Sequence, residues 1–127
     1  MATDNIPKRE SFIAGEDLSS YQYYAVYLSA AGTVSLCGHS AAYRPIGILD
    51  NKPKITEPAS VVVHGRTPAM LGGTVTFGQP LMSNELGKLV AGSAGLPYFA
   101  SAEVSGSATE VCSVFVHRVG ATKPLSP

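Results

Sequence analysis

Few residues in this chain of 127 carry a charge, and none is a tryptophan. Charged side chains make up 14% of the chain, nine basic residues balance nine acidic ones, and the formal net charge is zero. Such a chain has no bulk electrostatic attraction to nucleic acid or to an anionic membrane, so composition argues against both as partners. Hydrophobic residues make up 45% of the chain, which leaves few charged side chains for the surface. We expect protein partners to cover part of that surface.

Long apolar runs are missing as well. No run approaches the roughly 20 residues that cross a bilayer, and residues 1–10 hold no apolar stretch of the signal-peptide type. We therefore expect the protein to be made and kept in the cytoplasm. The length suits one domain with its own hydrophobic core.

Residue types that carry chemistry are scarce. The two cysteines, Cys37 and Cys112, each lie in a short apolar run, so we expect buried free thiols. A disulfide between them would be possible only if their strands are neighbours. His39, His64 and His117 lack the close spacing of metal ligands. The chain has neither a nucleophile elbow nor a phosphate-binding loop, and we expect no enzyme activity, metal or cofactor.

One acidic pair, Glu16 and Asp17, could share a cation or a proton. Adjacent side chains of an extended chain point in opposite directions, however, and Asp17 can instead accept backbone N–H groups of the loop that follows. The sequence therefore favours loop fixation over catalysis. For the tyrosines it favours core packing and protein interfaces over stacking on bases or sugars, because no basic stripe accompanies them.

Short β-like stretches between glycine and proline signals predict an all-β fold, a small β-barrel or β-sandwich with little helix. The predicted strands are 23–28, 33–37, 43–49, 59–65, 74–77, 80–83, 88–91 and 110–119. Residues 23–28 are apolar on both faces, which indicates that both are covered. Gly65 is expected to end its strand. Residues 96–105 fit either a strand or one helical turn.

Two features concern the organisation of the chain. The predicted hairpin at 80–91 echoes the one at 26–36, and both a repeat and a chance likeness of two glycine turns stay open. Residues 1–11 are polar and are expected to form an extended N-terminal arm, residues 12–119 the β-rich domain, and residues 120–127 a tail.

Several short motifs occur in a fixed order. They are Ala14-Gly15-Glu16-Asp17-Leu18-Ser19 with Gln22-Tyr23, Gly47-Ile48-Leu49-Asp50-Asn51-Lys52-Pro53, Val61-Val62-Val63 before Gly65, Gly73 and Gly78 around a strand, Leu81-Met82-Ser83-Asn84, and Gly87-Lys88-Leu89-Val90. In this order they resemble the small capsid decoration, or cement, proteins of tailed bacteriophages. The resemblance covers roughly residues 12–116. It departs at Gln79, where an acidic residue is expected, and in a longer C-terminal tail.

This resemblance implies a β-tulip-like domain, often a homotrimer, on the exterior of a phage head at three-fold or quasi-three-fold positions. There it would clamp neighbouring copies of the major capsid protein and stabilise the mature head, without catalysis. Two alternatives stay open. One is another virion component, such as a tail or head fibre. The other is a small ligand-binding β-barrel with a pocket around Glu16, Asp17 and His39.

Candidate contact residues can be named for the cement role. The arm could add a strand to an exposed capsid edge, and apolar loops with aromatic and arginine side chains could join subunits. The candidates for capsid contact are Ile6, Pro7, Lys8, Arg9 and Phe12. The candidates for oligomer contact are Tyr43, Arg44, Pro45, Tyr98 and Phe99.

Overall fold

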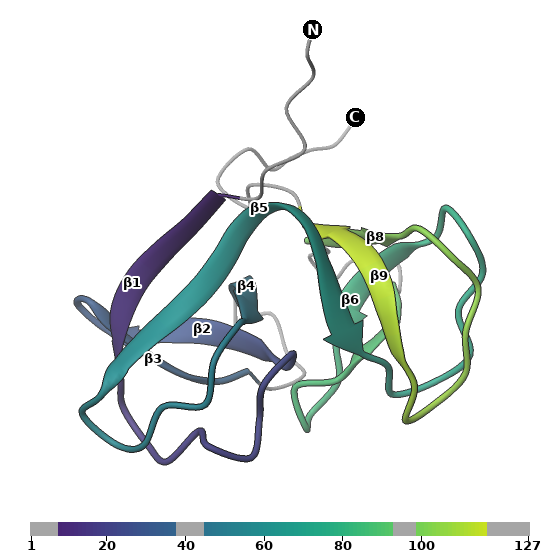
Figure 1. Cartoon of the computed structure of the whole chain (residues 1–127). Helices are drawn as coiled ribbons and strands as arrows, with labels where there is room; N and C mark the ends of the chain where they lie inside the picture. Colours follow the sequence, from purple (N-terminus) through teal and green to yellow (C-terminus); the bar gives the residue numbers. More distant parts are fainter. Residues whose placement is uncertain (1–7, 38–44, 93–98, 117–127) are drawn as a thin grey trace, which may run out of the picture.

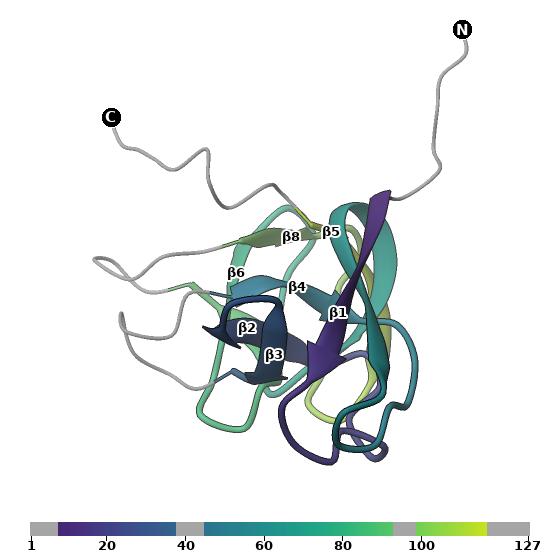
Figure 2. The same ribbon diagram turned by 90° about the vertical axis from the view of Figure 1, so that its left-hand side faces the viewer.

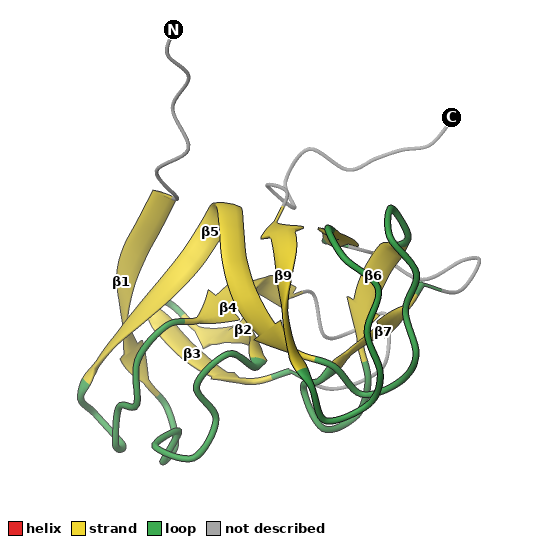
Figure 3. Cartoon of the chain, turned by 45° about the vertical axis from the view of Figure 1, so that its right-hand side comes forward, coloured by secondary structure: helices red, strands yellow, loops and turns green. Residues whose placement is uncertain are grey.

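Nine strands and no helix form the part of the chain that the computed structural model describes, which is residues 8–37, 45–92 and 99–116 (Figure 3). The predicted all-β class is confirmed. The strands are β1 (Lys8–Ala14), β2 (Ala25–Ala30), β3 (Thr33–Leu36), β4 (Pro45–Leu49), β5 (Pro58–Met70), β6 (Pro80–Ser83), β7 (Leu89–Ala91), β8 (Ala100–Ala102) and β9 (Val111–Val116).

The first five strands close into a barrel, here called ring 1. Its order is β1-β3-β2-β4-β5, and β5 pairs back onto β1 (Figure 2). β1 and β3 run parallel, whereas the other neighbouring pairs are antiparallel. Closure gives each strand of this barrel a neighbour on both sides, although β1 pairs with β3 only at Ile13 and Ala14.

The long strand β5 belongs to two layers and bends at Gly65. Its N-terminal part pairs with β1 and β4, and from Gly65 onward it pairs with β9. Gly65 has a φ of 116°, which side chains other than glycine rarely adopt. The prediction that Gly65 ends its strand is therefore wrong: this glycine turns the strand, which arches across the molecule (Figure 1).

The C-terminal half forms a second barrel, here called ring 2. Its order is β5-β9-β8-β6-β7, and Leu71, directly after β5, makes a parallel bridge to Leu89 of β7. Ring 2 is thus closed by one bridge where ring 1 is closed by a strand pair. β5 is shared by both rings.

Several other predicted strands are present, some with different first or last residues. The hairpin of β6 and β7 lies where predicted, and β9 covers 111–116 of the predicted 110–119. Residues 74–77 do not form a strand, because they leave the sheet apart from one bridge between Val75 and Gly106. In the ambiguous segment 96–105, β8 occupies 100–102.

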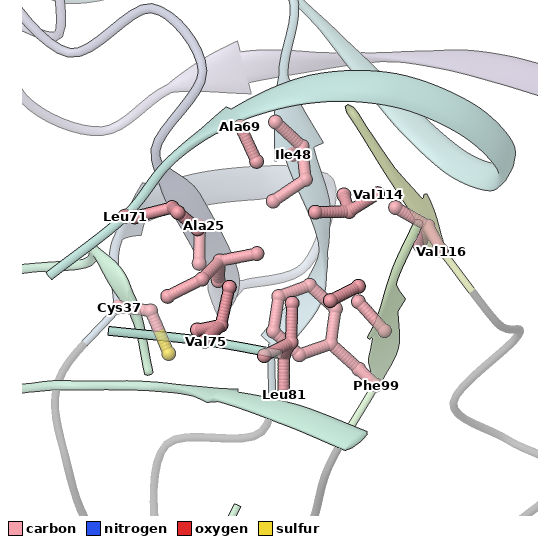
Figure 4. Close-up of a cluster of buried hydrophobic side chains, with 13 residues drawn as sticks. Ala25, Cys37, Ile48, Ala69, Leu71, Val75, Leu81, Phe99, Val114 and Val116 are labelled. Carbon is pink, nitrogen blue, oxygen red and sulfur yellow. The ribbon is translucent and has the colours of Figure 1, made fainter. Parts of the chain in front are cut away.

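Two core clusters fill the molecule. One lies inside ring 1 and includes Val26 and Leu49, while the other includes Ala25 and Ile48 together with the buried side chains of ring 2 (Figure 4). Neighbouring residues of β2 and of β4 therefore point into different clusters, as alternation along a strand requires. The prediction that both faces of the first hairpin strand are covered is confirmed at Ala25 and Val26 but not at Leu28, which is 47% exposed.

Rings 1 and 2 have the same topology. Strands β1, β2, β3, β4 and the first part of β5 correspond in order to the second part of β5, β6, β7, β8 and β9. Every strand pairing of ring 1 recurs in ring 2 with the same direction. The parallel pair is β1 with β3 in ring 1, and the bridge between Leu71 and Leu89 in ring 2. The hairpin 80–91 is thus the structural counterpart of the hairpin 26–36.

The correspondence extends to single hydrogen bonds. The amide of Gly15 donates to Val34 at 2.8 Å, and the amide of Gly72 donates to Leu89 at 2.7 Å. In each ring a Thr-Glu turn precedes the last strand, at 54–57 and at 107–110. The carboxylate of Glu57 accepts the amide of Lys54 at 2.8 Å in one, and that of Glu110 accepts the amide of Ser107 at 2.8 Å in the other.

Candidate functional site

The candidate contact residues on the arm lie partly in the sheet. Residues 8–11 of the predicted arm belong to β1, which pairs with β3 through its C-terminal end and with β5 along its length. Lys8 and Arg9 are exposed, and Phe12 packs against the ring 1 core. Ile6 and Pro7 lie outside the described residues, and the arm stays a prediction for 1–7.

Arg9 is not a free cation. Its Nε lies 2.6 Å from Oδ2 of Asp50, just after β4. Since β5 lies between β1 and β4 in the barrel, this ion pair spans the outer face of β5. The half-exposed guanidinium keeps one side toward solvent and is held in place by its own chain.

Two of the candidate oligomer residues are buried in the single chain. Phe99 is 1% exposed and packs in the core shared with ring 2, and Pro45, the first residue of β4, is buried as well. Their side chains are therefore already covered, because both stand in or beside strands that line a core. Tyr43, Arg44 and Tyr98 lie outside the described residues.

The acidic pair fixes its loop, as the sequence favours. Oδ1 of Asp17 accepts the hydroxyl of Ser19 at 2.7 Å and its amide at 3.0 Å. These bonds, the hydroxyl first, lower the pKa of Asp17 below its ordinary value. Oε2 of Glu16 accepts the amide of Leu36 at 2.8 Å, so each carboxylate is engaged with backbone.

A shallow open hollow of about 460 Å³ lies beside this loop, between the rings. Its walls come from Gly15, Glu16, Tyr27, Ser35, Leu36, Cys37 and Glu85. His39, the third residue of the alternative pocket, lies outside the described residues.

Other chemistry is sparse in the described ranges. They contain no group of three or more His, Cys, Asp or Glu side chains that could hold a metal ion, and no helix able to cross a membrane. Cys37 and Cys112 are free thiols, Cys37 buried as expected and Cys112 half-buried. Burial raises the pKa of the Cys112 thiol. Tyr21, Tyr23 and Tyr27 pack against the cores, as the sequence favours.

A more distinctive surface lies on the outside of ring 1, where β1 and β5 run side by side. Phe12, Ala14, Ala59, Val61 and Val63 point into the ring 1 core, so the intervening residues face outward. By this alternation the cross-strand pairs on the outer side are Arg9 with Val62, Ser11 with Ser60, and Ile13 with Pro58, of which Val62 is fully buried. We call this surface face 1.

The same succession recurs outside ring 2, where β5 and β9 run side by side. Its outward pairs are Arg66 with Phe115, Pro68 with Ser113, and Met70 with Val111. We call this surface face 2. Sequence reasoning missed both faces, although Arg9 belongs to one of them. The signal lay in the repeated order of arginine, small residue and apolar residue on alternate positions of each first strand.

Face 2 carries its own copy of the ion pair. Nε of Arg66 lies 2.6 Å from Oε1 of Glu103, just after β8, and the same oxygen accepts the hydroxyl of Ser113 at 2.9 Å. The pair spans β9, as the pair of Arg9 and Asp50 spans β5.

Comparison with solved structures finds the same architecture in a known protein. No family model and no curated protein matches the chain. The crystal structure of the head fibre gp8.5 N base of bacteriophage phi29 superposes with a TM-score of 0.62, at 11% sequence identity, over 90% of this chain and 97% of that one. At this identity the likeness establishes a shared fold.

Proposed function

We propose that this protein is a non-enzymatic structural component of a tailed-phage virion, attached to the outside of the head in the manner of a head-fibre base. The observation that carries the proposal is the fold shared with the phi29 head-fibre base, which extends over nearly the whole of both chains. A match limited to one barrel would support much less, because small barrels serve many functions.

The site geometry is consistent with a binding role. Both carboxylates of the acidic loop bond to backbone, and the two ion pairs occupy the exposed arginines Arg9 and Arg66. Faces 1 and 2 also offer apolar and hydroxyl side chains on a sheet, which suits a protein partner. The partner we propose is the major capsid protein.

A cement role is the second candidate. The ordered motifs of the sequence support it, and a molecule with two similar faces could bridge two subunits. In this role the protein would be a homotrimer at three-fold or quasi-three-fold positions. A fibre base and a cement protein would both lie on the outside of the head. They differ in how many copies the head carries.

The test is co-sedimentation of the purified protein with expanded heads stripped of it, quantified as copies bound per major capsid subunit. Saturation at far less than one copy per subunit, at sites set by the shell symmetry, is the result expected of a fibre base. Saturation near one copy per subunit would make it a cement protein. A sample without heads controls for self-pelleting. Failure to bind would contradict both.

A further inference from the structure

We propose that faces 1 and 2 bind two neighbouring copies of the same capsid subunit, so that one chain makes two equivalent contacts with the shell. This inference rests on the proposed function and adds the surface and the valency. Its basis is the duplication of one outer surface within a single chain.

Each face has the same order of chemistry along its strands. An arginine stands at one end, small or hydroxyl side chains occupy the middle, and apolar side chains form the other end. At the apolar ends Ile13 is 44% and Val111 is 46% exposed. Pro58, opposite Ile13, is exposed, and Met70, opposite Val111, is half-buried. By strand order Ile13 corresponds to Met70 and Pro58 to Val111, so each apolar end has an exposed hydrophobic side chain, on the first strand of face 1 and on the second strand of face 2.

Both faces carry an ion pair in the same place. Each joins the first strand of the face to the residue just after the strand on the far side, at 2.6 Å in both cases. Each arginine is thereby paired with a carboxylate. The faces consequently offer apolar contact with little net charge, which suits a weakly charged protein surface better than a polyanion.

Duplication is not general across the molecule. Where ring 1 has Gln22 and Asn51, which bond to backbone carbonyls, ring 2 has Phe77 and Val104, which are 71% and 44% exposed. The side chains at that end differ between the two barrels, whereas faces 1 and 2 have the same pattern. A surface kept in two copies on one chain fits a partner that is itself present in two copies.

A shell of identical subunits side by side is such a partner. Two contacts on one rigid chain act together, since the second forms at high effective concentration once the first has formed, and avidity then exceeds either single affinity by about 10²–10⁴. Neither face alone has to be strong. Loss of one face should therefore weaken attachment steeply, and to a similar extent whichever face is lost.

The test compares Ile13→Lys, Val111→Lys and the double variant for binding to stripped heads. Both positions are exposed, so the lysines fold without burial, and thermal unfolding checks this for each variant. Phe77→Lys is the matched control, because Phe77 is an exposed apolar residue of ring 2 with no apolar counterpart in ring 1. Each single variant should bind at least about 10²-fold more weakly than wild type, the double variant should not bind, and Phe77→Lys should bind like wild type.

Other outcomes separate this inference from the proposed function. If wild type binds but only one single variant is impaired, the protein uses one face and the two-contact model is wrong. If wild type binds and neither variant is impaired, both faces are the wrong surface, while attachment to the head stands. If wild-type protein does not bind, the proposed function itself fails.

Discussion

Thr56 and Thr109 have φ values of 69° and 68°, a conformation that β-branched residues rarely adopt. Each is followed by a glutamate that bonds back to the amide at the start of its turn. The same uncommon backbone at the same place in two rings is stronger evidence for their equivalence than shared strand order alone. The Thr-Glu dipeptide before each last strand is visible in the sequence, and it is the signal that could have exposed the repeat.

Asp17 offers a prediction about pH. The pKa of Asp17 in the folded chain lies below the ordinary value of 3.8. The bonds to Ser19 therefore stabilise the folded state at pH values above the unfolded pKa, and this stabilisation is lost as the pH falls through the folded pKa. Ser19→Ala removes the largest cause and should raise the pKa of Asp17 toward 3.8. Carboxyl-carbon NMR titration measures it. The control is Lys54→Gln, whose effect should be smaller, since Lys54 contributes least; an unchanged pKa in Ser19→Ala would contradict the assignment.

Residue-level reasoning from sequence succeeded where short-range chemistry decides. The Asx-type loop at Asp17 follows from one side chain and its next neighbours. The contact candidates fared differently: Phe99 and Pro45 are covered by the core, because burial depends on which strands come together, and that is not a local property of a sequence.

Among the elements, β5 determines the architecture. Its first part closes ring 1 and its second part begins ring 2, and Gly65 makes the change of direction between them. Sequence patterns predicted the strands of the two hairpins, since the turns at Gly32 and Gly87 have the positive φ that glycine suits, but they missed β1 and placed a strand at 74–77 that does not form. They missed the bend, because a glycine that turns a strand and one that ends it look alike in sequence.

The bend gives a prediction about stability. At a φ of 116° an alanine is strained, so Gly65→Ala should lower the free energy of unfolding by about 1–3 kcal/mol. Gly73→Ala is the control, because its added Cβ would meet only Val90, at 3.7 Å, and it should be close to neutral. Urea denaturation gives both values. Equal stability of Gly65→Ala and wild type would mean that β5 does not turn as described.

As a whole, the molecule is two equivalent barrels joined through one strand and a common core. The repeat was hard to see in sequence because the number of residues between equivalent positions is not constant. It decreases along the chain as loops shorten in ring 2, as three equivalent pairs show: Gly15 and Gly72, Gly32 and Gly87, and Glu57 and Glu110. Few side chains are identical between rings, since a barrel accepts any apolar residue of suitable size inward. The motif resemblance predicted a phage cement protein, whereas the solved structure that shares the fold is the base of a phage head fibre.

Electron cryomicroscopy of heads reconstituted with the protein tests the central claim most directly. The account predicts density for both rings on the outer surface of the shell, with faces 1 and 2 each against a major capsid subunit and the two subunits neighbours. Density that touches the shell through the loops carrying Phe77 and Val104, or heads that carry no added density, would contradict it.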